Sequence, residues 1–310
     1  MSLSLQHALF GRRYVERRID GAHLLLDVAD KGLHRDLLTR GYREPEQRFL
    51  VAQHLQPGMR AFDLGANIGY YTLLMSQRVG DDGWVYAVEP HPDNYALLRH
   101  NLASNAVRNV IAEQIAVADH YGAAALLLAD RCNWHSLHDP SITTASPWKT
   151  RYRREMRGSL PVNARHLAAF LADKPPLDLL RMDLEGYEVE ILRALAQVPY
   201  TQTRKLHILF ETHPEFYHPQ RHDMRAVLQR LHERHGYEAK CLISDFHHGS
   251  RHARDIAPAA SVFASRGYGA RHIVKAFDNR AIYSGVAMAD AIELICTSEN
   301  VHAAFLAPGA

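Results

Sequence analysis

Short apolar runs alternate with segments of helical pattern along most of the chain, starting directly after the helix-breaking pair Pro57-Gly58. Apolar runs of this length are typical of buried strands, and parallel strands must be joined by crossover segments that are usually helical. The alternation therefore predicts βαβ units and a doubly wound, mostly parallel sheet of the α/β class. We expect strands at 60–64, 84–89, 107–116, 177–183 and 205–211, and helices at 69–79, 92–105, 187–196 and 221–235.

Further elements are expected at both ends of this alternation. Apolar runs at 13–19 and 23–28 flank Asp20-Gly21, a pair that readily takes the positive φ angles of a tight turn, so they predict an N-terminal β-hairpin. A helix is expected at 46–55. Strands at 238–243 and 291–297 are predicted to form an antiparallel edge pair.

These elements give a provisional division of the chain. Residues 1–57 would be an N-terminal appendage of hairpin and helix, 58–297 the catalytic domain, and 298–310 a C-terminal tail. Residues 130–160 lack sustained periodicity, and they carry Trp134, Trp148 and a basic run, so they are either a lid over the site or an ordinary surface excursion. The irregular segment 245–283 contains His247, His248 and His252, which are expected in a polar surface loop rather than a metal site.

Composition limits the partners that the chain could bind. Lys and Arg number 36 against 34 Asp and Glu, a net charge of +2, which gives no strong field for nucleic acid. Three cysteines are too few and too widely spaced for a zinc knuckle or a disulfide scaffold. No apolar stretch near the start is long enough for a signal peptide or membrane span. We therefore expect a cytoplasmic protein with no nucleic-acid or membrane partner.

The residues Ala61–Thr72, AFDLGANIGYYT, place a glycine-containing loop between the first strand of the alternation and its helix. The carboxyl end of a strand is where open parallel sheets bind ligands, and Gly65 would allow the backbone to approach one closely. Gly69 would allow tight contact at the helix start, and Asp63 could accept hydrogen bonds from a cationic amino acid moiety. The spacing G-x-x-x-G differs from the G-x-G-x-x-G of dinucleotide sites, which favours S-adenosylmethionine. The predicted cofactor residues here are Asp63, Gly65, Ala66, Asn67, Gly69, Tyr71 and Thr72.

Two acidic residues at the next strand ends extend this site. Glu89 ends the second strand about twenty residues beyond the loop, where a carboxylate can bind both ribose hydroxyls. Asp119 follows the third strand and could reach the adenine amino group, although a solvated aspartate in a turn is nearly as good an interpretation.

The fourth and fifth strands end in polar residues at the same edge of the sheet. Asp183 and Glu185 follow the fourth strand, and Glu211 and His213 follow the fifth. They form a candidate catalytic constellation, and Asp183 is also a candidate cofactor residue.

The segments FDLGANIGYYT, VEPHPDNYALLRHNL, MDLEGYEVEIL and FETHP together resemble the FkbM family of methyltransferases and occur in the family order. The resemblance covers roughly residues 44–243. It implies a Rossmann-like class I methyltransferase fold and, for the activity, mainly O-methylation of hydroxyls on sugars, polyketides and related metabolites. The family's cofactor loop falls on Asp63–Thr72, its ribose acid on Glu89 and its D-x-E-G segment on Asp183–Gly186.

The chain departs from the family pattern at Arg165-His166-Leu167-Ala168, where family members often carry Thr-Leu-Asp. A helix-capping or substrate contact made by that aspartate therefore cannot be carried over.

Methyl transfer to a hydroxyl requires alignment of the oxygen and removal of its proton. We expect His213 to act as general base or to orient the substrate, with Asp183, Glu185 or Glu211 holding the imidazole or the hydroxyl. A histidine that caps a strand end is the structural alternative. A Mg²⁺ or Ca²⁺ ion on Asp183 and Glu211 is a further alternative, although carboxylates at strand ends need no metal, and our expectation is a site without one.

The predicted function is S-adenosylmethionine-dependent O-methylation of a small-molecule, sugar or glycan hydroxyl. Two other classes stay open: a non-catalytic protein that binds adenosylmethionine as a partner of an enzyme, and an RNA-modifying methyltransferase. The basic residues Lys149, Arg151, Arg153, Arg154 and Arg157 lack the aromatic platform on which bases stack, which weighs against RNA. The hairpin and the irregular C-terminal region leave a homo-oligomer open.

Overall fold

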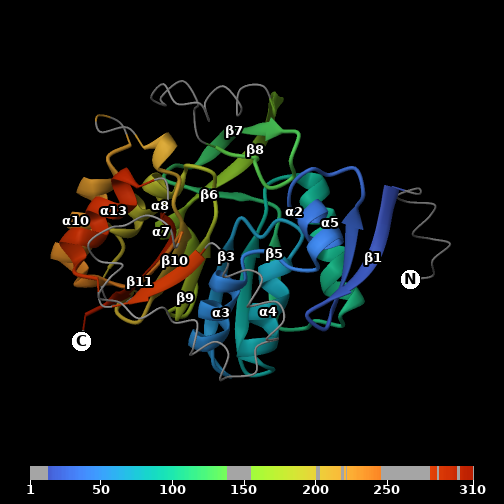
Figure 1. The fold of residues 1–310 in the computed structure, drawn as a ribbon, viewed down its shortest axis with the longest axis horizontal. Coiled ribbons are helices and arrows are strands. Elements are labelled where there is room, and N and C mark those ends of the chain that lie inside the picture. The colour runs from blue at the N-terminus through green and yellow to red at the C-terminus, as the bar shows by residue number, and fades with distance from the viewer. Residues whose placement is uncertain are drawn as a thin grey trace.

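A computed structural model describes residues 13–137, 155–199, 203–217, 220, 222–245, 280–284, 286–298 and 301–309. Its centre is an eight-stranded sheet in the order β12-β11-β13-β10-β9-β3-β4-β5 (Figure 1). Five neighbouring strands of this sheet run parallel: β3 (Arg60–Leu64), β4 (Trp84–Val88), β5 (Val110–Glu113), β9 (Leu179–Met182) and β10 (His207–Glu211). The other three are β11 (Tyr237–Asp245), β12 (Arg280–Ser284) and β13 (Val301–Pro308), with β13 antiparallel to both of its neighbours. This is the predicted doubly wound sheet with an antiparallel edge.

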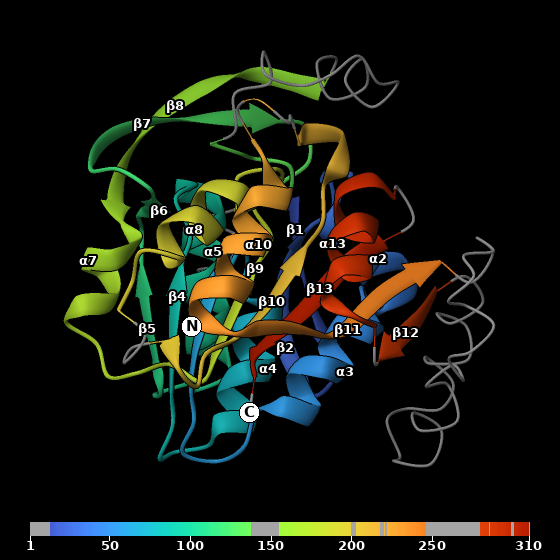
Figure 2. The same ribbon diagram turned by 90° about the vertical axis from the view of Figure 1, so that its left-hand side faces the viewer.

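Helices cover both faces of the sheet (Figure 2). One face packs against α3 (Pro45–His54), α4 (Tyr70–Val79) and α5 (Pro92–Ser104), and the other against α7 (Leu167–Ala172), α8 (Glu188–Leu195), α10 (Met224–His235) and α13 (Met288–Thr297). Successive side chains of β3 pack against opposite layers of helices: Ala61 belongs to the core on the α3, α4 and α5 side, and Phe62 to the core on the other side. Among the described residues no helix has both the length and the apolar character needed to cross a bilayer.

The predicted hairpin is confirmed and leads into a helix that was not predicted. β1 (Tyr14–Ile19) and β2 (Ala22–Asp27) pair around Asp20 and Gly21, whose φ angles are 50° and 85°. The hairpin is fixed to α5 by Asn101, whose Oδ1 accepts from Leu25 N at 2.7 Å. Next comes α2 (Leu33–Arg40), for which Leu33 and Leu37, four residues apart, and the capping Gly41 were available signals.

A single strand at 107–116 was a wrong prediction. The chain forms β5 and then β6 (Ala116–Ala118), which leaves the main sheet and pairs with β8 (Met156–His166). β8 also pairs with β7 (Gly122–Ala129), giving a small sheet in the order β6-β8-β7. The predicted irregular insertion 130–160 thus begins after β7 and ends inside β8. Its Trp148 and most of its basic run lie outside the described residues, as do His247, His248 and His252.

The C-terminal predictions also need correction. Residues 291–297 were predicted as a strand but form part of α13, because Ala291, Ile292 and Ile295 recur at helical spacing and are buried. The antiparallel strand is instead β13, in the segment that was predicted as a tail. Its almost continuous apolar sequence, VHAAFLAP, lies inside the sheet between β10 and β11.

Candidate functional site

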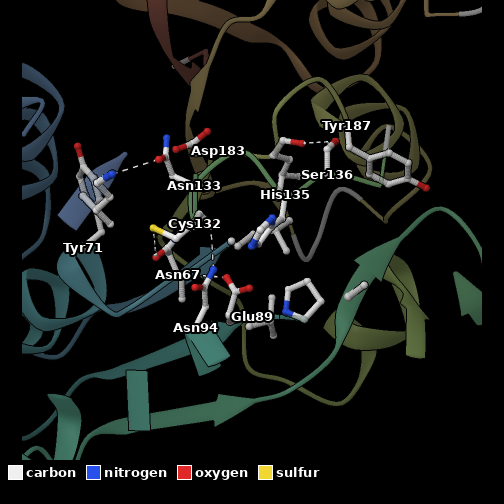
Figure 3. A pocket seen from close by; sticks show the side chains of 18 of the residues that line it. Asn67, Tyr71, Glu89, Asn94, Cys132, Asn133, His135, Ser136, Asp183 and Tyr187 are labelled. Atoms are coloured by element: carbon white, nitrogen blue, oxygen red, sulfur yellow. Dashed lines mark hydrogen bonds between the residues drawn. The ribbon is translucent and has the colours of Figure 1, made fainter. Parts of the chain in front are cut away.

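A cavity lies at the carboxyl ends of β3 and β4 (Figure 3). Its floor is the loop Gly65, Ala66 and Asn67, and its walls include Glu89 and the segment 115–117. Residues 130–137, which we call the roof segment, line the other side through Cys132, Asn133, His135, Ser136 and Leu137. This part of the predicted insertion therefore borders the cavity, and its role as a lid stays a prediction.

The loop after β3 is shaped by residues with positive φ. Gly65 has a φ of 80°, and the N–H groups of Gly65 and Ala66 both donate to Val88 O, at 3.1 and 3.0 Å. A Cβ on Gly65 would lie 2.6 Å from the carbonyl oxygen of Asp183. The close approach that the structure shows at this glycine is to the neighbouring strand end. Gly65 also lines the cavity, and its approach to a ligand stays a prediction. At Gly69 the expected tight contact at the helix start is confirmed, because a Cβ added there would lie 2.8 Å from Leu98. Gly69 does not line the cavity, although it was predicted as a cofactor residue.

Asp63 does not take the predicted role. Its side chain is completely buried and absent from the cavity lining. Asp63 lies opposite Arg181 in the register of β3 and β9; its Oδ1 is 3.6 Å from Arg181 Nη1, and its Oδ2 accepts from Thr72 Oγ1 at 2.6 Å. Burial raises the pKa of Asp63, whereas Arg181 and Thr72 lower it. Asp63 and Thr72 therefore belong to a buried network beneath the site.

One end of the cavity carries both positive and negative side chains. Arg43, Glu44, Tyr71 and Asp183 all line it. Tyr71 donates to Glu44 Oε2 at 3.0 Å, while Asp183 Oδ2 lies 3.2 Å from Arg181 Nη2. Within the described residues, Asp183 Oδ1 is buried without a hydrogen-bond partner. This end suits a zwitterion, with a guanidinium for its carboxylate and carboxylates for its ammonium group. Arg43 and Glu44 were missed from the sequence, because a turn before a helix carries no motif.

Glu89 borders the cavity as predicted, beside the loop. Its two carboxylate oxygens accept from the backbone N–H groups of Asn67, at 2.8 Å, and His91, at 2.9 Å. Burial raises the pKa of Glu89 to about 7, and the two N–H donors oppose that rise. The carboxylate is thus held in one orientation with acceptor capacity left for hydroxyl donors.

The roof segment is tied to the loop and to the N-terminal appendage. Cys132 O accepts from Asn67 Nδ2 and Asn94 Nδ2, both at 2.9 Å, and Cys132 N donates to Asp30 Oδ1 at 2.9 Å. Ser136 Oγ lies within 3.0 Å of the carbonyl oxygens of Leu184 and Glu185, to which it donates. The sequence did not identify Cys132 or Ser136 as site residues, and the irregularity of their segment was the only signal.

Asp119 is not placed against the cavity. Its Oδ1 accepts from the hydroxyl of Tyr187 at 2.8 Å and lies 3.0 Å from His120 Nδ1. The alternative interpretation, a solvated aspartate at a strand end, therefore describes this exposed residue better than an adenine contact does. The residues that do line the cavity near this strand end are Ile115, Ala116 and Val117.

His213 sits within a group of carboxylates next to Asp183. Its Nδ1 is 3.1 Å from Glu188 Oε1, while its Nε2 lies 3.6 Å from Glu185 and 3.7 Å from Glu211. Glu188 also accepts from the N–H groups of Leu184 and Gly186, at 2.9 and 3.0 Å, so its carboxylate is fixed. Glu188 is thus the residue that orients the imidazole, although the sequence pointed to its three neighbours. His213, Glu185 and Glu211 adjoin the cavity at Asp183 but do not line it.

The carboxylates of this group differ in protonation. Burial raises the pKa of Glu185 to about 8, and burial together with the charge of Asp183 raises that of Glu211 well above its usual range. Burial acts on Glu188 too, but the His213 imidazole and the hydrogen-bond donors outweigh it and lower its pKa. Glu188 is therefore the carboxylate that is ionised at neutral pH, as an anchor for an imidazole must be.

The same group bears on the metal alternative. One ligand atom each of Asp183, Glu188 and His213 lies within 4.8 Å of the other two, so these side chains could hold a metal ion. However, Glu188 Oε1 already accepts from both Leu184 N and His213 Nδ1. A carboxylate oxygen with two acceptor sites in use has little capacity left for an ion.

Comparison with known proteins gives partial matches. Methyltransferase 1 of Beauveria bassiana (strain ARSEF 2860) is 26% identical over 148 residues, which are 43% of this chain and 57% of that protein. Protein-L-isoaspartate O-methyltransferase of Methanothrix thermoacetophila is 38% identical over 56 residues, 18% of this chain and 27% of that one. The chain thus spans less than two thirds of these curated relatives. The crystal structure of M. jannaschii TYW2 in complex with AdoMet is 14% identical, with a TM-score of 0.43, and the match covers 97% of this chain and 90% of that one.

A family-level match covers more of the chain than the curated relatives do. The Methyltransferase FkbM domain matches residues 63–239, which include the loop after β3, Glu89, the D-x-E-G segment and His213. It covers more than half of the chain and agrees with the resemblance noted from the motifs. The chain belongs to the FkbM methyltransferase family.

Proposed function

We propose that this protein transfers the methyl group of S-adenosylmethionine to a hydroxyl group on a sugar, glycan or secondary metabolite. Glu89 would bind the ribose hydroxyls, and the charged end of the cavity would bind the amino acid portion. There Arg43 would face the carboxylate, and Oδ1 of Asp183, which has no hydrogen-bond partner among the described residues, would accept from the ammonium group. The family match and the charge pattern of the cavity support this assignment.

The oriented His213–Glu188 pair is the observation that carries the choice of a hydroxyl acceptor. When bound, S-adenosylmethionine supplies an electrophilic methyl group. An alcohol is a weak nucleophile at neutral pH, so a base that accepts its proton as the new C–O bond forms lowers the barrier. With Nδ1–H donating to Glu188, the tautomer of the imidazole places the ring lone pair on Nε2, the nitrogen that would accept that proton.

Methyl-transfer assays on a panel of hydroxyl-bearing sugars, glycans and polyketide alcohols test the proposal. We expect a methylated product, and mass spectrometry should show that its new methyl group is bound to oxygen. His213→Ala should lower kcat by about 10²–10⁴-fold, the usual contribution of a positioned base. Methylation of nitrogen or of RNA by the wild type, with no oxygen product, would overturn the choice of acceptor.

Glu188→Gln separates positioning from simple packing. It should lower kcat by roughly 10-fold or more, with little change in KM, and displace the acidic limb of the pH–rate profile, because the imidazole loses its ionic partner. Glu190→Gln is the matched control, since Glu190 is another buried acid of α8 but pairs with His222 and Arg193. Equal kinetics for the two variants would contradict a role for Glu188 in orienting His213.

The same assay distinguishes the metal and non-catalytic alternatives. We expect turnover to persist in EDTA. Loss of turnover that Mg²⁺ or Ca²⁺ restores would instead assign Asp183, Glu188 and His213 to an ion. Tight cofactor binding without methyl transfer to any acceptor would favour a non-catalytic partner protein.

A further inference from the structure

His135 lies on the roof segment, and its side chain lines the cavity (Figure 3). Its Nδ1 accepts a hydrogen bond from Ala129 N at 3.1 Å. A ring nitrogen that accepts a hydrogen bond carries no proton, so the neutral imidazole has its proton on Nε2. Within the described part of the chain, Nε2 has no hydrogen-bond partner. His135 is therefore a donor whose tautomer is fixed and whose donor group is unused.

The surroundings keep this imidazole uncharged. Burial, together with the neighbouring His91 imidazole, lowers the pKa of His135 to about 3. The two rings are in tilted contact, with centroids 4.3 Å apart and planes inclined by 31°. Because His91 directly follows Glu89 and Pro90, this contact places His135 at the Glu89 end of the cavity and away from the charged end.

The nearby lining suits a flat, apolar group with a few acceptors. Pro90, Val117, Leu126 and Leu137 line the cavity with apolar surface. A purine offers two apolar faces and three ring nitrogens that accept hydrogen bonds. A neutral donor suits such an uncharged acceptor, because neither partner is an ion that must be stripped of water.

We propose that the Nε2–H of His135 donates a hydrogen bond to a ring nitrogen of the purine base of the bound nucleoside. This inference rests on the proposed function, since it concerns the adenosine portion of the cofactor. His135 and Glu89 then have complementary tasks, because the imidazole donates to the base while the carboxylate accepts from the ribose. The roof segment is held at Cys132 and Ser136 by other contacts, so His135 is free to serve the ligand.

Calorimetric binding of S-adenosylhomocysteine to two variants tests the donor. In His135→Asn the amide oxygen can replace Nδ1 as the acceptor for Ala129 N, but no donor remains at the Nε2 position. In His135→Gln a side-chain N–H reaches that position. We expect the Asn variant to bind about 5- to 15-fold more weakly, the effect of one neutral hydrogen bond, and the Gln variant to recover most of the loss.

Analogues of S-adenosylhomocysteine with carbon in place of N1, N3 or N7 identify the acceptor. One of the three analogues should bind the wild type about 5- to 15-fold more weakly than S-adenosylhomocysteine does. The same analogue and S-adenosylhomocysteine should bind His135→Asn equally well. Nitrogen NMR of the ring checks the tautomer without ligand, and thermal unfolding checks that each variant is folded. If His135→Asn does not fold, the analogue series on the wild type still decides.

Equal affinity of the wild type and His135→Asn for S-adenosylhomocysteine would overturn the inference. So would analogue losses that persist unchanged in the variant, or no loss for any of the three analogues in the wild type. A wild type that binds neither S-adenosylhomocysteine nor the analogues would instead contradict the proposed function itself.

Discussion

Glutamates of identical chemistry hold their protons differently in and beside the cavity. Glu188, which accepts hydrogen bonds from two backbone N–H groups and from an imidazole, has a lowered pKa, whereas burial raises the pKa of Glu185 to about 8. The motif predicts that both glutamates follow the same strand, but it does not show how deeply each is buried or which hydrogen-bond donors each carboxylate meets. The sequence therefore predicted that Glu185 and Glu211 lie beside His213, as they do, but not that Glu188 is the carboxylate bound to the imidazole.

Residues contributed by loops were the hardest to predict. Asn67 and Glu89 line the cavity as expected, because they follow strands whose pattern is clear. Arg43 and His135 come from a turn and an irregular segment, and their place in the site depends on how distant loops fold together. Asp63 was assigned to the cofactor because its position in a strand end was known, while its partner across the sheet was not.

Glu89→Gln tests the cost of the charge at the ribose position. The folded pKa of Glu89, about 7, exceeds its usual 4.5, so its contribution to stability is complete below 4.5 and is lost as pH rises through 7. Glutamine is neutral throughout. From pH 5 to pH 8 the wild type should therefore lose up to about 3 kcal/mol of unfolding free energy relative to Glu89→Gln in urea titrations.

Two measurements accompany this variant. Glu89→Gln should also bind S-adenosylmethionine more weakly at pH 8, because an ionised acceptor is lost. Asp82→Asn, a change at an exposed turn residue, is the control and should follow the wild type at both pH values. Parallel stability curves for Glu89→Gln and the wild type would contradict the raised pKa.

Single elements were predicted best where the pattern was local. The bounds of β3 agree with the prediction, and α4 and α5 agree to within a residue at each end. The strand predicted at 107–116 divides because Ala116–Ala118 pairs with β8, a strand some forty residues later. Pairing between segments so far apart in the sequence produces no local sequence pattern that could predict it. The segment 165–168 lacks the aspartate that family members often carry there. At the start of α7 a histidine caps the helix, since His166 Nδ1 accepts from Ala168 N at 3.1 Å.

Gly65→Ala and Gly58→Ala together measure the tight packing between β3 and β9. Both glycines have positive φ, 80° and 84°, so both variants incur a backbone strain of about 1 kcal/mol. Only Gly65→Ala adds a Cβ 2.6 Å from a backbone oxygen, whereas nothing lies within 4 Å at Gly58. We expect Gly65→Ala to lose roughly 1–3 kcal/mol more than Gly58→Ala in urea unfolding. Equal losses would show that the loop moves freely away from Asp183.

At the scale of the molecule, the alternating pattern was sufficient for the fold class but not for the order of its last strands. The apolar stretch 291–297 fits a strand or a buried helix almost equally well, and its burial against neighbouring elements decides for α13. If 291–297 is taken as the last strand of the sheet, Val301–Pro308 has no place in the sheet and is predicted to be a tail. The sheet in fact requires it, because β13 pairs with both β10 and β11.

Removal of residues 301–310 should abolish cooperative unfolding. The truncated chain would expose the edges of β10 and β11 and the apolar faces that β13 covers, so we expect aggregation or the loss of a sigmoidal thermal transition in circular dichroism. A chain that ends at Pro308 keeps the strand and should unfold like the full chain. A soluble, cooperatively folded protein without residues 301–310 would contradict the structural role of β13.

The position of β13 also has a consequence for synthesis. β10 and β11 leave the ribosome well before the strand that separates them, so the nascent chain must keep a gap between two strands that are both able to pair. Premature pairing of β10 with β11 would exclude β13 and trap the polypeptide in a non-native sheet. Completion of this half of the sheet must therefore wait until β13 has been synthesised, and a chaperone that shields strand edges would act during that interval.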